Sequence, residues 1–123
     1  MPRKREQRRS VCPVACTLDV LGDKWTLLVI RDLLNGRSSF QEFVGSPERI
    51  ATNILSDRLE RLVGGGLVET VPSTVRSDRH TYRLTDRGRA LTPVLEAIRD
   101  WGLAHIPGTQ TRLKPRAAMT PGK

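Results

Sequence analysis

The side chains of this chain best suited to chemistry are short polar and basic ones on one predicted helix. Apolar residues recur at helical spacing over residues 50–63, which predicts a helix with one buried face. Asparagine can bind adenine through its amide group, and arginine can reach guanine or phosphate. The opposite face therefore has the chemistry of a helix that reads base edges, and an ordinary solvated face is the alternative. The candidate contact residues of this segment are Arg49, Thr52, Asn53, Ser56 and Arg58.

A second polar group precedes a short predicted helix at residues 40–44. Arg37, Ser38 and Ser39 come directly before Phe40. The free N–H groups at a helix N-terminus suit an anion such as a phosphate. A serine at this position can equally serve only as a cap, so both interpretations stay open.

Two short strands follow the 50–63 helix and enclose a polar loop. Three glycines at 64–66 end the helix, because glycine adopts the left-handed conformation without a steric penalty. Residues 67–71 and 81–84 have strand character, and Pro72 limits the first strand. The loop carries Arg76, Arg79 and His80, which are candidates for contacts to phosphate or to the minor groove. An ordinary charged hairpin tip is the alternative.

Further helices must position these groups, and the sequence predicts them at 11–21, 24–34 and 86–103. Asp23 and Thr85 are candidate N-terminal caps. Pro93 lies inside the last helix, where it predicts a kink or a frayed first turn. Helix, glycine stop, strand, polar turn, strand and helix, in this order, form the layout of a winged helix-turn-helix. The expected fold is therefore mainly α with a small antiparallel β-wing.

The length of 123 residues suits one domain. We expect a folded domain at 11–106, a basic disordered tail at 1–10 and a basic tail with proline and glycine at 107–123. No apolar run approaches the roughly 20 residues of a membrane span. The N-terminus lacks the apolar core of a secretory signal. A cytoplasmic protein without a membrane partner is the resulting expectation.

The net charge of +8 belongs to the two ends of the chain. Residues 1–11 hold five basic residues and one acidic residue, and residues 112–123 hold four basic residues and no acidic one. The middle of the chain is balanced. Basic ends suit contact with phosphate through counterion release, and disordered solubilising ends are the alternative.

No pattern in the sequence is typical of an enzyme. The glycines at 64–66 follow a helix rather than a strand, and they lack the lysine and hydroxyl residue of a phosphate-binding loop. No serine and histidine are spaced as a catalytic pair. Cys12, Cys16, His80 and His105 lack the paired spacing of a zinc site. We therefore expect no catalytic residue, no cofactor and no metal.

A series of short motifs runs through residues 12–103. The motifs are Cys12-Pro13-Val14, Leu21-Gly22-Asp23-Lys24-Trp25-Thr26, Ile30-Arg31-Asp32-Leu33-Leu34-Asn35-Gly36, Phe40-Gln41-Glu42-Phe43, Ile50-Ala51-Thr52-Asn53-Ile54-Leu55-Ser56-Asp57-Arg58-Leu59, Gly66-Leu67-Val68-Glu69, Tyr82-Arg83-Leu84-Thr85-Asp86-Arg87-Gly88, Leu91-Thr92-Pro93-Val94-Leu95 and Trp101-Gly102. In their order and spacing they resemble the HxlR family of bacterial transcriptional regulators, a branch of the winged-helix proteins. The resemblance implies a homodimer that binds double-stranded DNA at a palindromic operator and regulates transcription, as a repressor, at the bacterial nucleoid. A winged-helix protein-interaction module without DNA binding is the rival interpretation.

The first and last predicted helices carry apolar stripes that a chain of this size cannot fully bury alone. These stripes, together with the resemblance, predict a dimer interface. The candidate interface residues are Val14, Leu18, Leu91, Leu95, Ile98 and Trp101.

Cys12 follows the basic residues Arg8 and Arg9, and nearby cations lower the pKa of a thiol. In some members of the HxlR family a cysteine at this point senses oxidants or electrophiles. The resemblance therefore makes Cys12 a redox-sensing candidate, with an oxidant or a small molecule as the inducer. A packing role at the dimer interface is the alternative.

Overall fold

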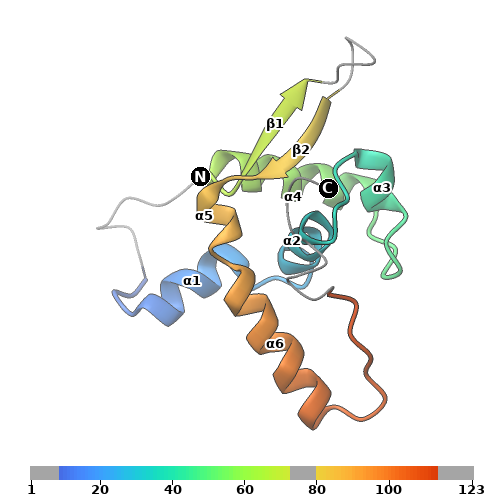
Figure 1. Cartoon of the computed structure of the whole chain (residues 1–123). Coiled ribbons are helices and arrows are strands. Elements are labelled where there is room, and N and C mark those ends of the chain that lie inside the picture. The colour runs from blue at the N-terminus through green and yellow to red at the C-terminus, as the bar shows by residue number, and fades with distance from the viewer. Residues whose placement is uncertain (1–8, 73–79, 114–123) are drawn as a thin grey trace.

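The structure, a computed structural model, describes residues 9–72 and 80–113. The candidates Arg76 and Arg79 and most of the two basic ends lie outside these residues. The elements are α1 (Pro13–Leu21), α2 (Thr26–Leu34), α3 (Phe40–Val44), α4 (Thr52–Gly64), β1 (Val68–Pro72), β2 (His80–Leu84), α5 (Asp86–Arg89) and α6 (Thr92–His105) (Figure 1). The two strands pair antiparallel, and the prediction of a mainly α fold with a small β-wing is confirmed. In the described part of the chain, no helix is both long enough and apolar enough to cross a membrane.

The core lies where α2, α3 and α4 meet the base of the wing. Ile30 of α2 and Leu55 of α4 have no exposed surface, and Phe43 of α3 is 1% exposed. Val68 and Leu84, which face each other across the two strands, close the core from the side of the wing. One face of α4 is thus fixed against the core, and the opposite face is left to solvent.

A tight junction joins α4 to the wing. Gly66 has a φ of +76°, in the left-handed region that favours glycine, and it allows Leu67 to donate back to the carbonyl of Leu62 at 3.0 Å. A Cβ at Gly88 of α5 would overlap the carbonyl oxygen of Leu67. Glycine at both positions therefore lets α4, β1 and α5 meet at close range.

The prediction of a single last helix at 86–103 is wrong, because the chain forms two helices there, α5 and α6. Thr85 caps α5 by accepting a hydrogen bond from the Gly88 amide at 3.1 Å. The chain then turns, and Pro93 lies in the first turn of α6. Proline has no N–H to donate and clashes with the preceding turn, so a helix tolerates it only at its start.

The chain after α6 turns back toward α2 (Figure 1). Leu113 is 5% exposed and belongs to the core, and the Asn35 side chain donates to the carbonyl of Arg112 at 2.6 Å. The expectation of a tail from residue 107 is therefore wrong for residues 107–113. A lone leucine among proline, glycine and polar residues has no periodicity that would reveal its burial.

Candidate nucleic-acid interface

α4 exposes a polar face at its N-terminal end. Ala51 occupies the N-cap, and no side chain accepts a hydrogen bond from the first-turn amides. These N–H groups point out of the helix end without a side-chain cap, and they suit a phosphate oxygen. The exposed residues of this end are Thr52, Asn53 and Ser56, which the sequence nominates as base contacts.

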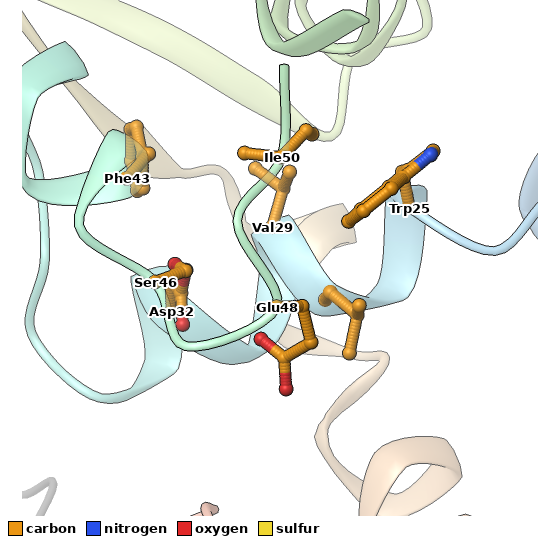
Figure 2. A pocket seen from close by; sticks show the side chains of 8 residues that line it. Trp25, Val29, Asp32, Phe43, Ser46, Glu48 and Ile50 are labelled. Atoms are coloured by element: carbon orange, nitrogen blue, oxygen red, sulfur yellow. The ribbon is translucent and has the colours of Figure 1, made fainter. Parts of the chain in front are cut away.

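An ion-pair cluster underlies the turn between α3 and α4, in which Arg31 and Asp32 are buried and Glu48 is 35% exposed. Figure 2 shows Asp32, Ser46 and Glu48 of this cluster. Arg31 donates two hydrogen bonds of 2.8 Å to the Glu48 carboxylate and pairs with Asp32 at 2.9 Å. The Ser46 hydroxyl donates to the other oxygen of Asp32. The Arg31 and Asp32 side chains are only 9% and 6% exposed. The cavity beside the cluster is only about 10 Å³, which leaves room for at most one water molecule.

This cluster fixes the backbone of Arg49, which lies three residues before the first residue of α4. Arg49 has a φ of +59° and is exposed, and its amide donates to the carbonyl of Ser46 at 3.0 Å. A non-glycine residue held in the left-handed region costs roughly 1–3 kcal/mol, which the surrounding structure must offset. The turn therefore presents a basic side chain near the N-terminal end of α4.

Arg58 does not lie free on the polar face as the sequence predicts. Its guanidinium pairs with Asp23 at 2.7 Å and also with Asp57, and its side chain is 15% exposed. Arg61 pairs with the same Asp57 carboxylate at 3.0 Å. Arg58 is thus a structural residue that ties α4 to the start of α2. The pattern alone could not reveal this role because Asp23 is 35 residues away.

Asp23 is the centre of this link. Its carboxylate accepts hydrogen bonds from the Trp25 and Thr26 amides at 3.0 and 3.1 Å and so holds the turn that leads into α2, although the N-cap residue is Trp25 rather than the predicted Asp23. Partial burial opposes ionisation of Asp23. Hydrogen bonds from the Thr26 hydroxyl, Arg58 and the Trp25 amide outweigh it and lower the pKa of Asp23 to about 2. The carboxylate therefore stays ionised at neutral pH.

The segment before α3 is a capping box. The Ser39 hydroxyl accepts from the Glu42 amide at 3.2 Å, and the Glu42 carboxylate accepts from the Ser38 and Ser39 amides at 2.8 and 3.0 Å. These amides lower the pKa of Glu42. Arg37 donates to the Glu42 carbonyl. Of the two interpretations of this site, the structure favours capping, since the chain's own carboxylate occupies the anion position. The spacing Ser39-x-x-Glu42 is a sequence signal of this box.

The wing is attached to the same segment. The Tyr82 amide of β2 donates to the Ser38 carbonyl at 2.8 Å, a contact that no local pattern predicts. Arg83 and Glu69 pair across the strands at 2.6 Å. His80, the first residue of β2, is exposed, and its ring nitrogen lies 3.1 Å from the Tyr82 hydroxyl. The wing therefore leaves the body of the molecule close to α3, with His80 toward its tip.

Apolar side chains of α1 and α6 remain exposed in the single chain. Leu95 is an exception: it is 6% exposed and belongs to the core, so its assignment to a dimer interface is wrong. Leu91 is half-buried against the same core. We call the remaining four residues the apolar face: Val14 (67% exposed), Leu18 (54%), Ile98 (53%) and Trp101 (61%).

Cys12 is exposed just before α1. The pKa of its thiol is lowered by hydrogen bonds from the Ala15 and Val14 amides, at the N-terminus of the helix. The sequence predicts instead that a neighbouring cation lowers this pKa. Arg9 forms an ion pair with Asp19 at 2.7 Å, and Arg8 lies outside the described residues. The Cys16 thiol donates to the carbonyl of Ser10 at 3.3 Å.

A helix-turn-helix followed by a two-stranded wing defines the winged-helix class. The profile of the family described as HxlR-like helix-turn-helix matches residues 20–110. The chain therefore belongs to the HxlR-like helix-turn-helix family, as the motifs predict.

Relatives and solved structures agree with this membership. The chain is 36% identical to the HTH-type transcriptional regulator YvaP of Bacillus subtilis, over 72% of this chain and 82% of YvaP. It is 35% identical to the HTH-type transcriptional regulator Mb3122 of Mycobacterium bovis, over 76% of this chain but only 59% of Mb3122. The crystal structure of PA1607 matches with a TM-score of 0.78 and 44% identity, over 90% of this chain and 79% of PA1607. The reduced form of the redox regulator HypR matches with a TM-score of 0.67 and 32% identity, over 76% and 92%. These relatives are regulators rather than enzymes.

Proposed function

We propose that the protein binds double-stranded DNA sequence-specifically as a homodimer and represses transcription from a palindromic operator. The observation that carries the proposal is the contrast along α4. The polar side chains of its N-terminal end, Thr52, Asn53 and Ser56, are exposed, while Asp57, Arg58 and Arg61 further along form ion pairs within the chain. The N-terminal end of a recognition helix is the part that meets base edges in the major groove.

Contacts to the DNA backbone would come from the groups around the N-terminal end of α4. The first-turn amides of α4 and the exposed Arg49 offer hydrogen-bond donors to phosphate. His80, together with Arg76 and Arg79, which lie outside the described residues, is proposed to contact phosphate or the minor groove. The basic ends of the chain add counterion release. A DNA partner would place the protein at the nucleoid of a bacterial cytoplasm.

The homodimer follows from the apolar face. Four large apolar side chains of α1 and α6 are each more than half exposed, and exposed apolar patches mark interaction sites. A two-fold dimer would place two α4 helices about 34 Å apart, which is one turn of DNA. A palindromic operator mirrors that symmetry.

In vitro selection from a random duplex pool tests the proposal. We expect a palindromic consensus and a steep loss of affinity with rising salt. Asn53→Ala should lose about 1–3 kcal/mol of discrimination at one base pair of each half-site. Glu60→Gln, an exposed change on the same helix, is the control and should keep the consensus. A protein that binds no duplex at low salt would instead be a protein-interaction module.

A second proposal concerns regulation through Cys12. The thiol is exposed and its pKa is lowered at a helix N-terminus, which favours the reactive thiolate. HypR, which is similar in structure, is described as a redox regulator. We propose that an oxidant or an electrophile that modifies Cys12, beside the apolar face, loosens DNA binding.

A further inference from the structure

A second and larger pocket lies between α2, α6 and the chain segment that follows α6. Its volume is about 380 Å³, within the range of roughly 300–1,000 Å³ that is typical of small-molecule sites. Six large apolar residues line it: Leu27, Leu28, Leu95, Ile98, Leu103 and Leu113. The ion-pair cluster beneath the helix-turn-helix reaches this pocket only through Arg31 and Glu48.

The segment at 109–113 forms one wall and is held at both ends. The Thr109 hydroxyl donates to the carbonyls of Ile106 and Gly102 at 2.9 and 3.2 Å, at the end of α6. At the other end, Asn35 holds the carbonyl of Arg112 and Leu113 is buried in the core. The backbone between these two anchors spans the pocket, so the cavity is a built feature of the fold.

The charges at the pocket favour an anion. Arg31, Arg99 and Arg112 line it, and Glu48 is the one acidic residue among the lining side chains. Glu48 is engaged by Arg31 through two hydrogen bonds, and Arg99 pairs with Asp100, which does not line the pocket. Arg112 is exposed, its charge helps to lower the pKa of Glu48, and it forms no ion pair within the described ranges. A ligand carboxylate could therefore bind Arg112 and Arg99 without displacing Glu48.

We propose that this pocket binds a small, largely apolar carboxylate, which bridges α6, α2 and the 109–113 segment. The ring or chain of the ligand would lie against the leucines, and its carboxylate would lie at Arg99 and Arg112. Because Ile98 belongs both to this wall and to the apolar face, a bound ligand would act next to the proposed dimer interface. That regulatory consequence rests on the proposed DNA binding, whereas ligand binding itself does not.

Titration of the full chain with naphthalene-2-carboxylate, followed by ¹H–¹⁵N NMR, tests the binding. We expect saturable shifts at Gly102 and at residues 109–113, with a Kd below about 1 mM. The uncharged 2-naphthalenemethanol should bind several-fold more weakly. The double variant Arg99→Gln with Arg112→Gln should remove this preference for the carboxylate. Absence of saturation, or a preference that survives the double variant, would overturn the proposal.

A glycine on the wall allows a filled-pocket variant. A Cβ at Gly102 meets nothing within 4 Å, and leucine is a better helix former than glycine, so Gly102→Leu should fill the pocket without unfolding α6. We expect both probes to bind about tenfold more weakly or not at all. Gly64→Leu is the matched control, since Gly64 also has open space in α4 and lies away from the pocket.

Sedimentation of the same variants tests whether a second copy of the chain, rather than a small ligand, fills the pocket. If Gly102→Leu dissociates a dimer and the wild-type protein binds neither probe, a second copy of the chain fills the pocket and the ligand proposal is wrong. If Gly102→Leu binds the probes as well as the wild-type protein, the binding lies elsewhere and the proposal is equally wrong. A separate DNA titration with and without naphthalene-2-carboxylate then reports on regulation alone.

Discussion

The surface around the start of α4 and the apolar face of α1 and α6 are both exposed, but they are built in opposite ways. Near α4, acidic and basic side chains find partners within the chain, and these pairs hold the helix and its turn in place. On the apolar face, Val14, Leu18 and Trp101 each remain more than half exposed within the described chain. The first surface is thus rigid and polar before any partner arrives, and the second is incomplete without one.

The difference indicates which partner each surface suits. Base recognition requires side chains held in a defined geometry, and the ion pairs beneath α4 supply that geometry. An apolar patch gains mainly from removal of water, so it suits a second protein surface.

Removal of the buried arginine should cause the largest loss. Arg31→Met leaves the buried Asp32 and the partly exposed Glu48 without their cation, and breaking a buried pair such as Arg31 with Asp32 costs about 3–5 kcal/mol. Urea unfolding at fixed protein concentration measures this loss. Arg61→Met is the control, because Arg61 is 65% exposed and its pair with Asp57 should contribute less than about 1 kcal/mol. Equal losses in the two variants would show that the cluster does not hold the turn.

A charge on the apolar face should separate the protomers. Leu18→Glu should give a folded monomer at micromolar concentration, and DNA affinity should fall by about 100-fold, near 2.7 kcal/mol, because each chain then binds only one half-site. Sedimentation and a DNA titration measure the two effects. Val63→Glu adds the same charge at an exposed apolar position of α4 and should leave the dimer intact. A Leu18→Glu dimer as stable as the wild type would contradict the interface.

The link between α2 and α4 should show in the pH dependence of stability. The pKa of Asp23 is about 2, below its ordinary value, so its contribution is complete above the unfolded pKa near 3.9 and is lost as the pH falls toward 2. Asp23→Asn should therefore cost about 2 kcal/mol at pH 7, and the difference from the wild type should shrink steadily below pH 4. Chemical unfolding across this range measures it.

A control for this link is Asp100→Asn, since Asp100 is 65% exposed and, among the described residues, its ion pair is with its neighbour Arg99. That variant should change stability little at any pH. A cost of Asp23→Asn that is the same at pH 2.5 and pH 7 would mean that the charge of Asp23 is not what holds Arg58.

The smallest effect is expected at Cys12. Diamide should weaken DNA binding several-fold, near 1 kcal/mol, and Cys12→Ser should abolish this response while basal affinity stays unchanged. Cys16→Ser should keep the response, because Cys16 is partly buried. Mass spectrometry must show that Cys12 is modified. Unchanged affinity of the modified wild-type protein would leave Cys12 without a regulatory role.

The elements of the fold follow from local patterns. The spacing of Leu55, Leu59 and Leu62 predicts the buried face of α4, and the glycines at 64–66 predict its end, because both signals act within a few residues. The break before α6 could also be read locally, since Pro93 requires a helix start. Exposure of Thr52, Asn53 and Ser56 follows directly from the burial of the opposite face.

By itself, the sequence determined the fold class, the family, and the helix end that presents polar side chains, since each depends on local periodicity, turn residues or motif order. Only the tertiary structure decided which polar groups are free. Arg58 is held by Asp23, and Leu95 and Leu113 are in the core. The physical reason is that an ion pair or a buried contact joins residues far apart in the chain, and no local pattern records which distant partner a side chain will meet.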